Sequence, residues 1–215
     1  MIIRTQTGYF YQSYSADDGK TWSEPARTAF RAPNAPGGIC RLDDGRIALC
    51  WNDLSQYPEG VAGSKRQFLH AAISENDGRT FRRSREIARI REGDLPNTNV
   101  AYPFLCPTAD GQVLVSAVDR HTIYALDAAS GRENWAFVAG GRVDAPPARY
   151  RGMALFGCAD GHVYAVDAKD GELVWRFRGA PTGRKLMSYG QLESVWPISG
   201  SVLVQGGKLY CVAGR

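Results

Sequence analysis

Short apolar stretches separated by Asp-Gly turns run along the whole chain, and helical periodicity is almost absent. The stretches are rich in β-branched and aromatic residues, as in GYFYQSYS, RIALCWN, FLHAAIS, QVLVSAV, TIYALDA, MALFGCA, HVYAVDA, LVWRF, SVLVQ and KLYCVA. Between them lie DDGK, DDGR, NDGR, ADGQ, ASGR, ADGH, KDGE and QGGK, which are strong signals for tight hairpins. Many short antiparallel strands at a spacing of roughly ten residues predict an all-β sandwich, barrel or propeller.

Two internal repeats distinguish among these folds. The segment SADDGKTW, which starts at Ser15, matches SENDGRTF, which starts at Ser74, 59 residues later. A second pattern, Ala-x-Asp-x3-Gly-x3-Trp, starts at Ala125 and returns at Ala165, 40 residues later. A repeat of about 40–50 residues with four strands is typical of propeller blades. We therefore predict a β-propeller built of antiparallel blades.

The repeated residues predict a structural role. In the first pattern, Asp and Ser side chains bond the turn backbone, Gly supplies a positive φ, and the aromatic residue packs under the turn. In the second pattern, the strand ends at Asp, turns at Gly and returns with a Trp buried between neighbouring blades. The residues expected to do this are Ser15, Asp17, Gly19, Trp22, Ser74, Asn76, Gly78 and Phe81 in the first pattern, and Asp127, Gly131, Trp135, Asp167, Gly171 and Trp175 in the second.

The first pattern resembles the Asp box of sialidases and related BNR-repeat proteins, and this resemblance covers residues 1–117. The second box departs from it, with Asn76 where Asp is usual. The second pattern resembles the tryptophan-docking repeat of quinoprotein dehydrogenase-like (PQQ-like) propellers, which also occurs in assembly factors that bind no quinone, and it covers residues 118–215. The chain thus resembles two propeller families joined inside one blade.

Strand counting on this basis gives about three strands for residues 1–30, one full blade for each of residues 36–90, 100–139 and 144–178, and about two strands for residues 195–213. We expect a hybrid or truncated propeller of about four blades, continuous across the join. Incomplete blades leave unpaired edges, which favour association. One solution is closure by pairing of the two chain ends, with a strand such as SVLVQ completing the first blade. The alternative is an open arc that associates with a partner or with itself.

The resemblance to sialidases implies a partial catalytic set. Arg4 and Arg66 match arginines that bind the substrate carboxylate, and Tyr102 matches the nucleophilic tyrosine. A guanidinium binds a carboxylate through two hydrogen bonds, and a phenol needs a neighbouring carboxylate to become nucleophilic. The first arginine of the triad, the acid/base Asp and the Glu partner of the tyrosine have no matching position. Asp53 or Glu59 is the nearest stand-in for that Glu.

Structural interpretations of the same residues stay open. Arg4 can also be an exposed arginine on a strand, and Arg66 can be a solvated loop charge beside Lys65. Tyr102 can be a residue that packs at a strand end before Pro103. Six arginines lie within residues 79–91. They fit a solvated outer strand better than a site for an anionic glycan or nucleic acid.

Composition excludes several classes of protein. Hydrophobic residues make up 44% and charged residues 22% of 215 residues, with a net charge of +4, which excludes a disordered chain and gives no reason to expect nucleic acid. No apolar run is long enough to cross a membrane as a helix. The N-terminus lacks the features of a signal peptide, whereas the resemblance implies a secreted or periplasmic origin, so the compartment stays open. The five cysteines and three histidines have no metal-ligand spacing.

These observations predict a non-catalytic or vestigial propeller that serves as a scaffold or glycan-binding module. We expect no metal and no cofactor, since the Cys-Cys pair typical of PQQ enzymes is missing. One alternative is an exo-sialidase-like glycoside hydrolase acting on acidic sugars, and another is a protein-interaction propeller of the assembly-factor type. The expected partners are a glycan or acidic sugar, a protein, or a second copy at open blade edges, and not a membrane or nucleic acid.

Overall fold

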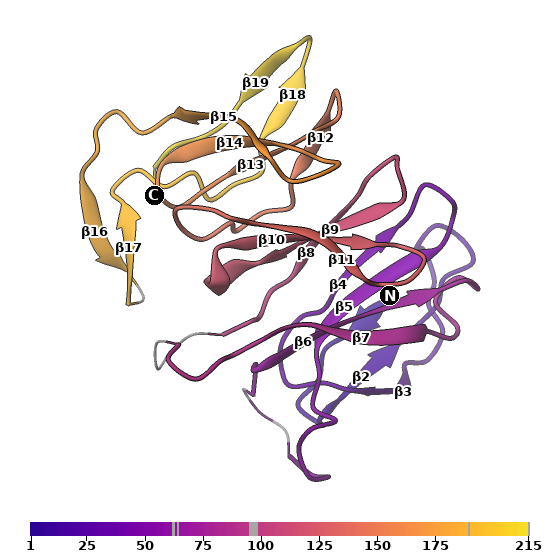
Figure 1. Cartoon of the computed structure of the whole chain (residues 1–215). Helices are drawn as coiled ribbons and strands as arrows, with labels where there is room; N and C mark the ends of the chain where they lie inside the picture. Colours follow the sequence, from indigo (N-terminus) through magenta and orange to yellow (C-terminus); the bar gives the residue numbers. More distant parts are fainter. Residues whose placement is uncertain (62, 64, 95–98, 189, 215) are drawn as a thin grey trace.

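The computed structural model describes residues 1–61, 63, 65–94, 99–188 and 190–214, and these form a series of antiparallel sheets (Figure 1). Sheet 1 contains β1 (Ile2–Ile3), β2 (Tyr9–Gln12) and β3 (Ala26–Arg31). Sheet 2 contains β4 (Gly38–Arg41), β5 (Ile47–Asn52), β6 (Phe68–Ser74) and β7 (Arg82–Arg89). Sheet 3 contains β8 (Phe104–Pro107), β9 (Gln112–Ala117), β10 (Thr122–Asp127) and β11 (Glu133–Val138), with the 3-10 helix η1 (Val118–Arg120) between β9 and β10. Sheet 4 contains β12 (Ala148–Tyr150), β13 (Met153–Gly157), β14 (His162–Asp167) and β15 (Leu173–Arg178).

Two hairpins complete the described fold. They are β16 (Lys185–Ser188) with β17 (Gln191–Ser194), and β18 (Leu203–Gln205) with β19 (Lys208–Tyr210). The predicted strand count of three, four, four, four and two is confirmed for sheets 1 to 4 and for the pair β18–β19. The sequence did not predict the hairpin β16–β17.

Strands in each sheet follow one another in chain order, as in a propeller blade. In sheet 3, β10 pairs with β9 along its whole length, from Thr122 opposite Ala117 to Asp127 opposite Gln112. The part of the chain with the first repeat and the part with the second repeat therefore contribute neighbouring strands to one sheet.

The two ends of the chain do not pair in the described structure. Strand β1 pairs with β2, and β18 pairs with β19, and no ladder joins the two sets among the described residues. Instead β18 lies beside β12 of sheet 4. An apolar cluster that includes Leu155, Val163, Ile198 and Val202 holds the C-terminal segment there, so burial against sheet 4 determines its position.

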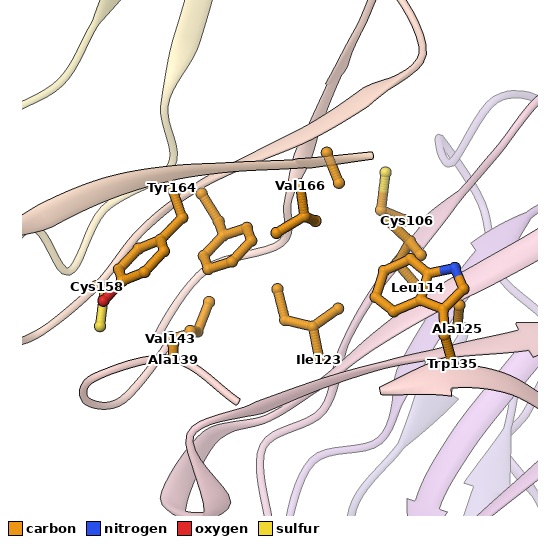
Figure 2. Packing of buried hydrophobic residues seen from close by; sticks show 12 residues of the cluster. Cys106, Leu114, Ile123, Ala125, Trp135, Ala139, Val143, Cys158, Tyr164 and Val166 are labelled. Atoms are coloured by element: carbon orange, nitrogen blue, oxygen red, sulfur yellow. The ribbon is translucent and has the colours of Figure 1, made fainter. Parts of the chain in front are cut away.

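Apolar side chains fill the space between neighbouring sheets. Figure 2 shows Ile123 of sheet 3 pointing toward Val166 of sheet 4, in a cluster that also contains Trp135 and Tyr164. The rings of Phe156 and Tyr164 stack with centroids 5.5 Å apart. These clusters bury side chains from two sheets at once, so each sheet depends on its neighbour for stability.

The sheets have two distinct ends, because antiparallel strands reverse at each turn. We call one end the connecting face. It carries residues 4–8, 53–61, 63, 65–67, 90–94, 99–103, 118–121, 139–147 and 158–161, which join two strands of a sheet or lead from one sheet to the next. The opposite end, the turn face, carries the Asp-Gly turns of both repeats.

Both turns of the first repeat use the same hydrogen bonds. Asp17 Oδ1 accepts from Thr21 N at 2.9 Å, and Asn76 Oδ1 accepts from Thr80 N at 2.8 Å. Because an amide oxygen accepts this bond as a carboxylate does, the turn keeps its shape with Asn. Trp22 stays partly exposed and packs on its own turn, where its Nε1 donates to Gly19 O at 2.9 Å.

The second repeat has two unequal copies. Trp135 is 8% exposed and packs against Gly171 of the next sheet. Trp175 is 37% exposed, contrary to the expectation that it is buried between sheets. Among the described residues, no turn packs on Trp175 as Gly171 packs on Trp135, which leaves Trp175 exposed like the rest of β15.

One backbone carbonyl recurs at the contacts between sheets. Ala128 O in the turn of sheet 3 accepts from Arg46 Nη1 of sheet 2 at 2.8 Å. At the equivalent position in sheet 4, Ala168 O accepts from Trp135 Nε1 at 3.2 Å. The equivalent carbonyl therefore accepts from an arginine at one contact between sheets and from a tryptophan at the next.

Candidate functional site

Four parts of the connecting face surround an open cleft of about 530 Å³. The segment before β8 contributes Tyr102, η1 contributes Asp119, the β11–β12 loop contributes Arg142 and Asp144, and β17 contributes Gln191. These residues are far apart in sequence, and the stacking of sheets 3 and 4 brings them together. A cleft of this size and polarity is the usual form of a ligand site.

Tyr102 has an unusual backbone conformation. Its φ is +57°, a left-handed value that is uncommon for a bulky residue and is further disfavoured before a proline such as Pro103. The side chain is 42% exposed, and the guanidinium carbon of Arg66 lies 4.9 Å from the ring centroid. Strained residues of this kind concentrate at functional sites.

Arg66 holds the ring of Tyr102 from the second loop of sheet 2. Its Nη2 donates to Asn34 O at 3.2 Å, while its Nε is buried and has no hydrogen-bond partner in the described part of the chain. A buried donor without a partner calls for an ordered water or a ligand. Arg66 therefore retains binding capacity beside Tyr102.

Arg142 is the centre of an ionic cluster. Its Nε donates to Oε1 of the fully buried Glu193 at 2.7 Å, and its Nη1 lies 3.4 Å from Asp144 Oδ1. Burial acts to lower the pKa of Arg142, but the hydrogen bond to Glu193 and the charge of Asp144 outweigh it, so the pKa lies above its usual value. The guanidinium thus stays charged and fixed in position.

The two aspartates of the cleft are partly withdrawn from water. Burial raises the pKa of Asp119, against the opposing effect of the nearby Arg142 charge. Burial likewise raises the pKa of Asp144, and the carboxylates of Glu193 and Asp119 add to the shift. Among the described residues, three carboxylates lie near Arg142 at this end of the cleft, and Arg66 also acts on Asp119. The carboxylates outnumber the two guanidinium groups, so a cationic group from a ligand would be attracted there.

A second open cavity, of about 590 Å³, lies on the other side of Asp119 and Gln191. Its wall includes Arg120, which forms an ion pair with Asp94 at 2.6 Å. Asp119 and Gln191 line both cavities. Tyr124 of β10 and Glu133 of β11 also line the second cavity, so it extends along sheet 3, and Asp119 and Gln191 form the wall that it shares with the cleft.

The structure brings together two of the three residues proposed from sequence. Arg66 and Tyr102 are in contact, as described above. Arg4 lies exposed in the loop after β1, and no hydrogen bond, ion pair or ring contact joins it to Arg66 or Tyr102 within the described residues. Asp53 Oδ2 accepts from Ser55 N at 2.9 Å, so the Asp53 carboxylate stabilises the turn in which it lies. Glu59 is exposed.

Five site residues were not identified from sequence as members of a site: Asp119, Arg142, Asp144, Gln191 and Glu193. They lie in loops, in η1 and in the unpredicted hairpin, where no repeat pattern applies. The sequence signal that could have identified these residues is the presence of charged side chains in the loops between sheets, because these loops lie on one face of the fold.

The arginine-rich segment has internal contacts. Arg83 Nη1 donates to Ala129 O in sheet 3, Arg89 Nη2 donates to Glu86 Oε2 at 2.7 Å, and the Arg79 guanidinium carbon lies 5.5 Å from the ring centroid of Tyr14. These contacts support the structural interpretation of a charged outer strand.

Within the described ranges, no group of three or more His, Cys, Asp and Glu residues is placed to hold a metal ion. No helix among these residues is long and apolar enough to cross a membrane.

Two protein-family models match the chain. The BNR repeat-like domain matches residues 1–115, and the outer membrane protein assembly factor BamB matches residues 66–215. The predicted resemblance to both types of propeller repeat is thus confirmed. No curated protein matches the chain in sequence.

Solved structures match the fold of the chain. BamB from Moraxella catarrhalis has a TM-score of 0.60 at 18% identity, covering 99% of this chain and 52% of that one. The computationally designed Ika8 protein has a TM-score of 0.56 at 10% identity, with 99% and 52% covered. Sqt1 from Saccharomyces cerevisiae has a TM-score of 0.55 at 12% identity, with 84% and 44% covered. The chain therefore spans about half the length of these structures, and the likeness shows a β-propeller fold.

Proposed function

Because the chain belongs to the BNR repeat-like domain family through residues 1–115 and to the family of the assembly factor BamB through residues 66–215, we propose that it is a non-catalytic binding module. Its ligand is a basic segment of a partner protein, which binds in the cleft of the connecting face. We place the boundary between its two kinds of repeat at residues 117 and 118, between β9 and β10 of one continuous sheet.

The observation that carries this proposal is the charge balance of the cleft. Asp119, Asp144 and Glu193 surround the guanidinium of Arg142, and Arg66 is a second cation that acts on Asp119, so three carboxylates face two guanidinium groups among the described residues. The raised pKa values of Asp119 and Asp144 mean that burial disfavours their charged forms. A lysine or arginine side chain entering the cleft would stabilise both carboxylates by charge-assisted hydrogen bonds.

The lack of catalytic geometry supports a binding role. A tyrosine nucleophile requires a base that takes its proton. In the described residues, no hydrogen bond connects the Tyr102 hydroxyl to a carboxylate, and Asp53 serves its own turn. Catalytic groups that act as a unit lose nearly all of their effect when members are missing.

The test is a calorimetric titration of the 215-residue chain with a decalysine peptide, a decaglutamate peptide and N-acetylneuraminic acid. We expect the cationic peptide alone to bind, and Asp119→Asn or Asp144→Asn to weaken its binding by about tenfold. Asp18→Asn on the turn face is the matched control and should have no effect. Equal binding of the peptide to all variants, or no binding, would refute the proposal.

A second candidate function is a sialidase-like glycosidase, as the sequence resemblance implied. The contact between Arg66 and Tyr102, and the partly buried Asp119 beside them, favour it. The test is hydrolysis of a fluorogenic sialoside by the wild type and by Tyr102→Phe. Turnover that disappears in the variant would establish this function and replace the binding proposal.

A further inference from the structure

A third open cavity, of about 540 Å³, lies on the turn face between sheets 1 and 2. No described residue lines both this cavity and either cavity of the connecting face. Both Asp boxes, residues 15–22 of sheet 1 and residues 74–81 of sheet 2, contribute to its walls. The lining includes Ile2, Tyr14, Trp22, Ile39, Asp77 and Phe81. The volume is in the range of sites for small ligands.

The two Asp boxes place their aromatic residue in different surroundings. The ring centroid of Phe81 lies 5.2 Å from that of Phe30, and both rings pack against the apolar cluster of sheets 1 and 2. Trp22, at the same position of the first box, is 46% exposed and belongs to no apolar cluster among the described residues. The core therefore does not use this indole, whose open face is free to contact a ligand.

Hydrogen bonds fix the walls of the cavity in advance. Trp22 Nε1 donates to Gly19 O at 2.9 Å, and Gly19 N donates to Ser15 Oγ at 2.8 Å, so the indole is held on its own turn. The Tyr14 hydroxyl donates to Gly78 O at 3.0 Å, which joins sheet 1 to the second Asp box. A site with fixed walls loses little conformational entropy when a ligand binds.

The polar groups of the cavity suit hydroxyl groups better than a charged ligand. Arg41 Nη2 lies 2.9 Å from Asp77 Oδ1, and Arg41 Nη1 donates to Gly45 O at 2.7 Å. The Arg79 guanidinium carbon lies 5.5 Å from the ring centroid of Tyr14. A carboxylate ligand must displace one of these contacts, whereas a hydroxyl accepts from Arg41 and donates to Asp77 without separating them.

From this arrangement we propose that the cavity binds a neutral, β-linked oligosaccharide of glucose-type sugars, with one pyranose ring stacked on Trp22. Such a ring carries its hydroxyl groups around its edge and only C–H groups on its two faces. One face therefore packs on the indole while the edge bonds to Arg41 and Asp77. The site lies on the opposite face from the cleft, so the chain can hold a glycan and a basic polypeptide segment together.

The experiment is a titration of the ¹⁵N-labelled 215-residue chain with cellohexaose, followed by NMR and calorimetry. We expect the Trp22 indole N–H signal to shift, and the Gln191 amide signal on the connecting face to stay in place. Trp22→Ala should weaken binding by about tenfold through the loss of stacking. Asp77→Ala should weaken it by about threefold through the loss of one acceptor.

Two further variants control for indirect effects. Trp175→Ala removes another exposed tryptophan, on β15 of sheet 4, and should leave the affinity for cellohexaose unchanged. Trp22→Phe keeps an aromatic face and should retain more affinity than Trp22→Ala. Circular dichroism verifies that each variant is folded, and the wild-type shift at the Trp22 indole decides the matter if Trp22→Ala does not fold.

Three results would overturn the proposal. One is an unchanged Trp22 indole signal in the presence of cellohexaose, and another is equal affinity of the wild type and Trp22→Ala. The third is a shift of this signal with N-acetyl-leucine amide but not with cellohexaose, which would make the ligand an apolar side chain. The proposed function has a separate readout, because Trp22→Ala leaves the cleft and its decalysine titration unchanged.

Discussion

Two equivalent glycines of the second repeat, Gly131 and Gly171, have different surroundings. Both have a positive φ, of +69° and +78°. A Cβ on Gly171 would lie 2.5 Å from Trp135 Cε3, whereas the nearest atom to a Cβ on Gly131 is Arg85 Cδ at 3.7 Å. Both positions therefore require a positive φ, whereas an indole ring lies close to Gly171 and not to Gly131.

Replacement of these glycines by alanine separates the two effects. Gly131→Ala should cost about 1–2 kcal/mol of unfolding free energy from the left-handed backbone alone. Gly171→Ala should cost about 1–3 kcal/mol more, because the added methyl group must displace Trp135. Urea unfolding monitored by circular dichroism measures both, and equal losses would contradict the packing argument.

The two Asp boxes differ in their response to acid. The Thr21 backbone N–H, then the Thr21 and Ser15 hydroxyls, lower the pKa of Asp17 from 3.8 to about 2, whereas Asn76 does not titrate. A lowered pKa contributes stability that is present above the unfolded value and is lost as the pH falls through the folded value.

Asp17→Asn should therefore be less stable than the wild type at pH 5, and the difference should shrink as the pH falls toward about 2. Unfolding free energies of both proteins between pH 2 and 5 measure this. Asn76→Ser serves as a control, because a loss at the second box should not depend on pH in this range. A constant difference for Asp17→Asn would disprove the assignment.

The residues of the cleft illustrate how far sequence can lead. Arg66 and Tyr102 were predicted from a resemblance, and the structure places them in contact, but their role stays a prediction. Asp119, Arg142 and Glu193 carry no motif, because their proximity arises from the stacking of sheets 3 and 4 and from the hairpin β16–β17. A local pattern encodes turns and strands, and it does not encode contacts between loops.

The elements were largely predictable for the same reason. Each Asp-Gly turn between two β-branched runs specifies a hairpin by local chemistry, so strands such as β6 and β14 follow from sequence. The hairpin β16–β17 was missed because RKLMS and GQLES have little β-branched or aromatic content. Polar contacts with the connecting face, which lie outside the pattern, hold it in place.

The exposed strand β15 gives a prediction about its tryptophan. Trp135→Ala should lower the unfolding free energy by about 3–5 kcal/mol, since it empties a packed site between two sheets. Trp175→Ala, at the same position of the next repeat but 37% exposed and in a strand whose residues are all exposed, should cost less, about 1 kcal/mol. Thermal or urea unfolding of the two variants compares them, and similar losses would show that Trp175 is buried in solution.

The whole molecule has an uneven surface. Exposed large apolar side chains concentrate on β15 and on the last two strands, where they include Leu173, Phe177, Leu203 and Tyr210. The outer strand of sheet 2, by contrast, is covered with arginine, which protects an edge against unwanted pairing. Apolar patches and open edges of this kind favour association.

We expect the chain to associate with itself as its concentration rises, through the surface of β15. Phe177→Asp should reduce this association, whereas Ile39→Asp, also at an exposed apolar residue but on β4, should not. Sedimentation velocity across a range of concentrations measures the effect. A monomer at all concentrations would mean that this surface does not attract a second copy.

The recurring carbonyl at the contacts between sheets bears on how such a chain can arise. Ala128 O receives a hydrogen bond from Arg46, and Ala168 O receives hydrogen bonds from both Trp135 and Gln112. The carbonyl at this position thus accepts from arginine, tryptophan or glutamine, so chemically unrelated side chains of the preceding sheet can supply the donor. Genetic recombination can join a repeat of one lineage to a repeat of another more readily when this carbonyl at the new junction accepts from several kinds of side chain.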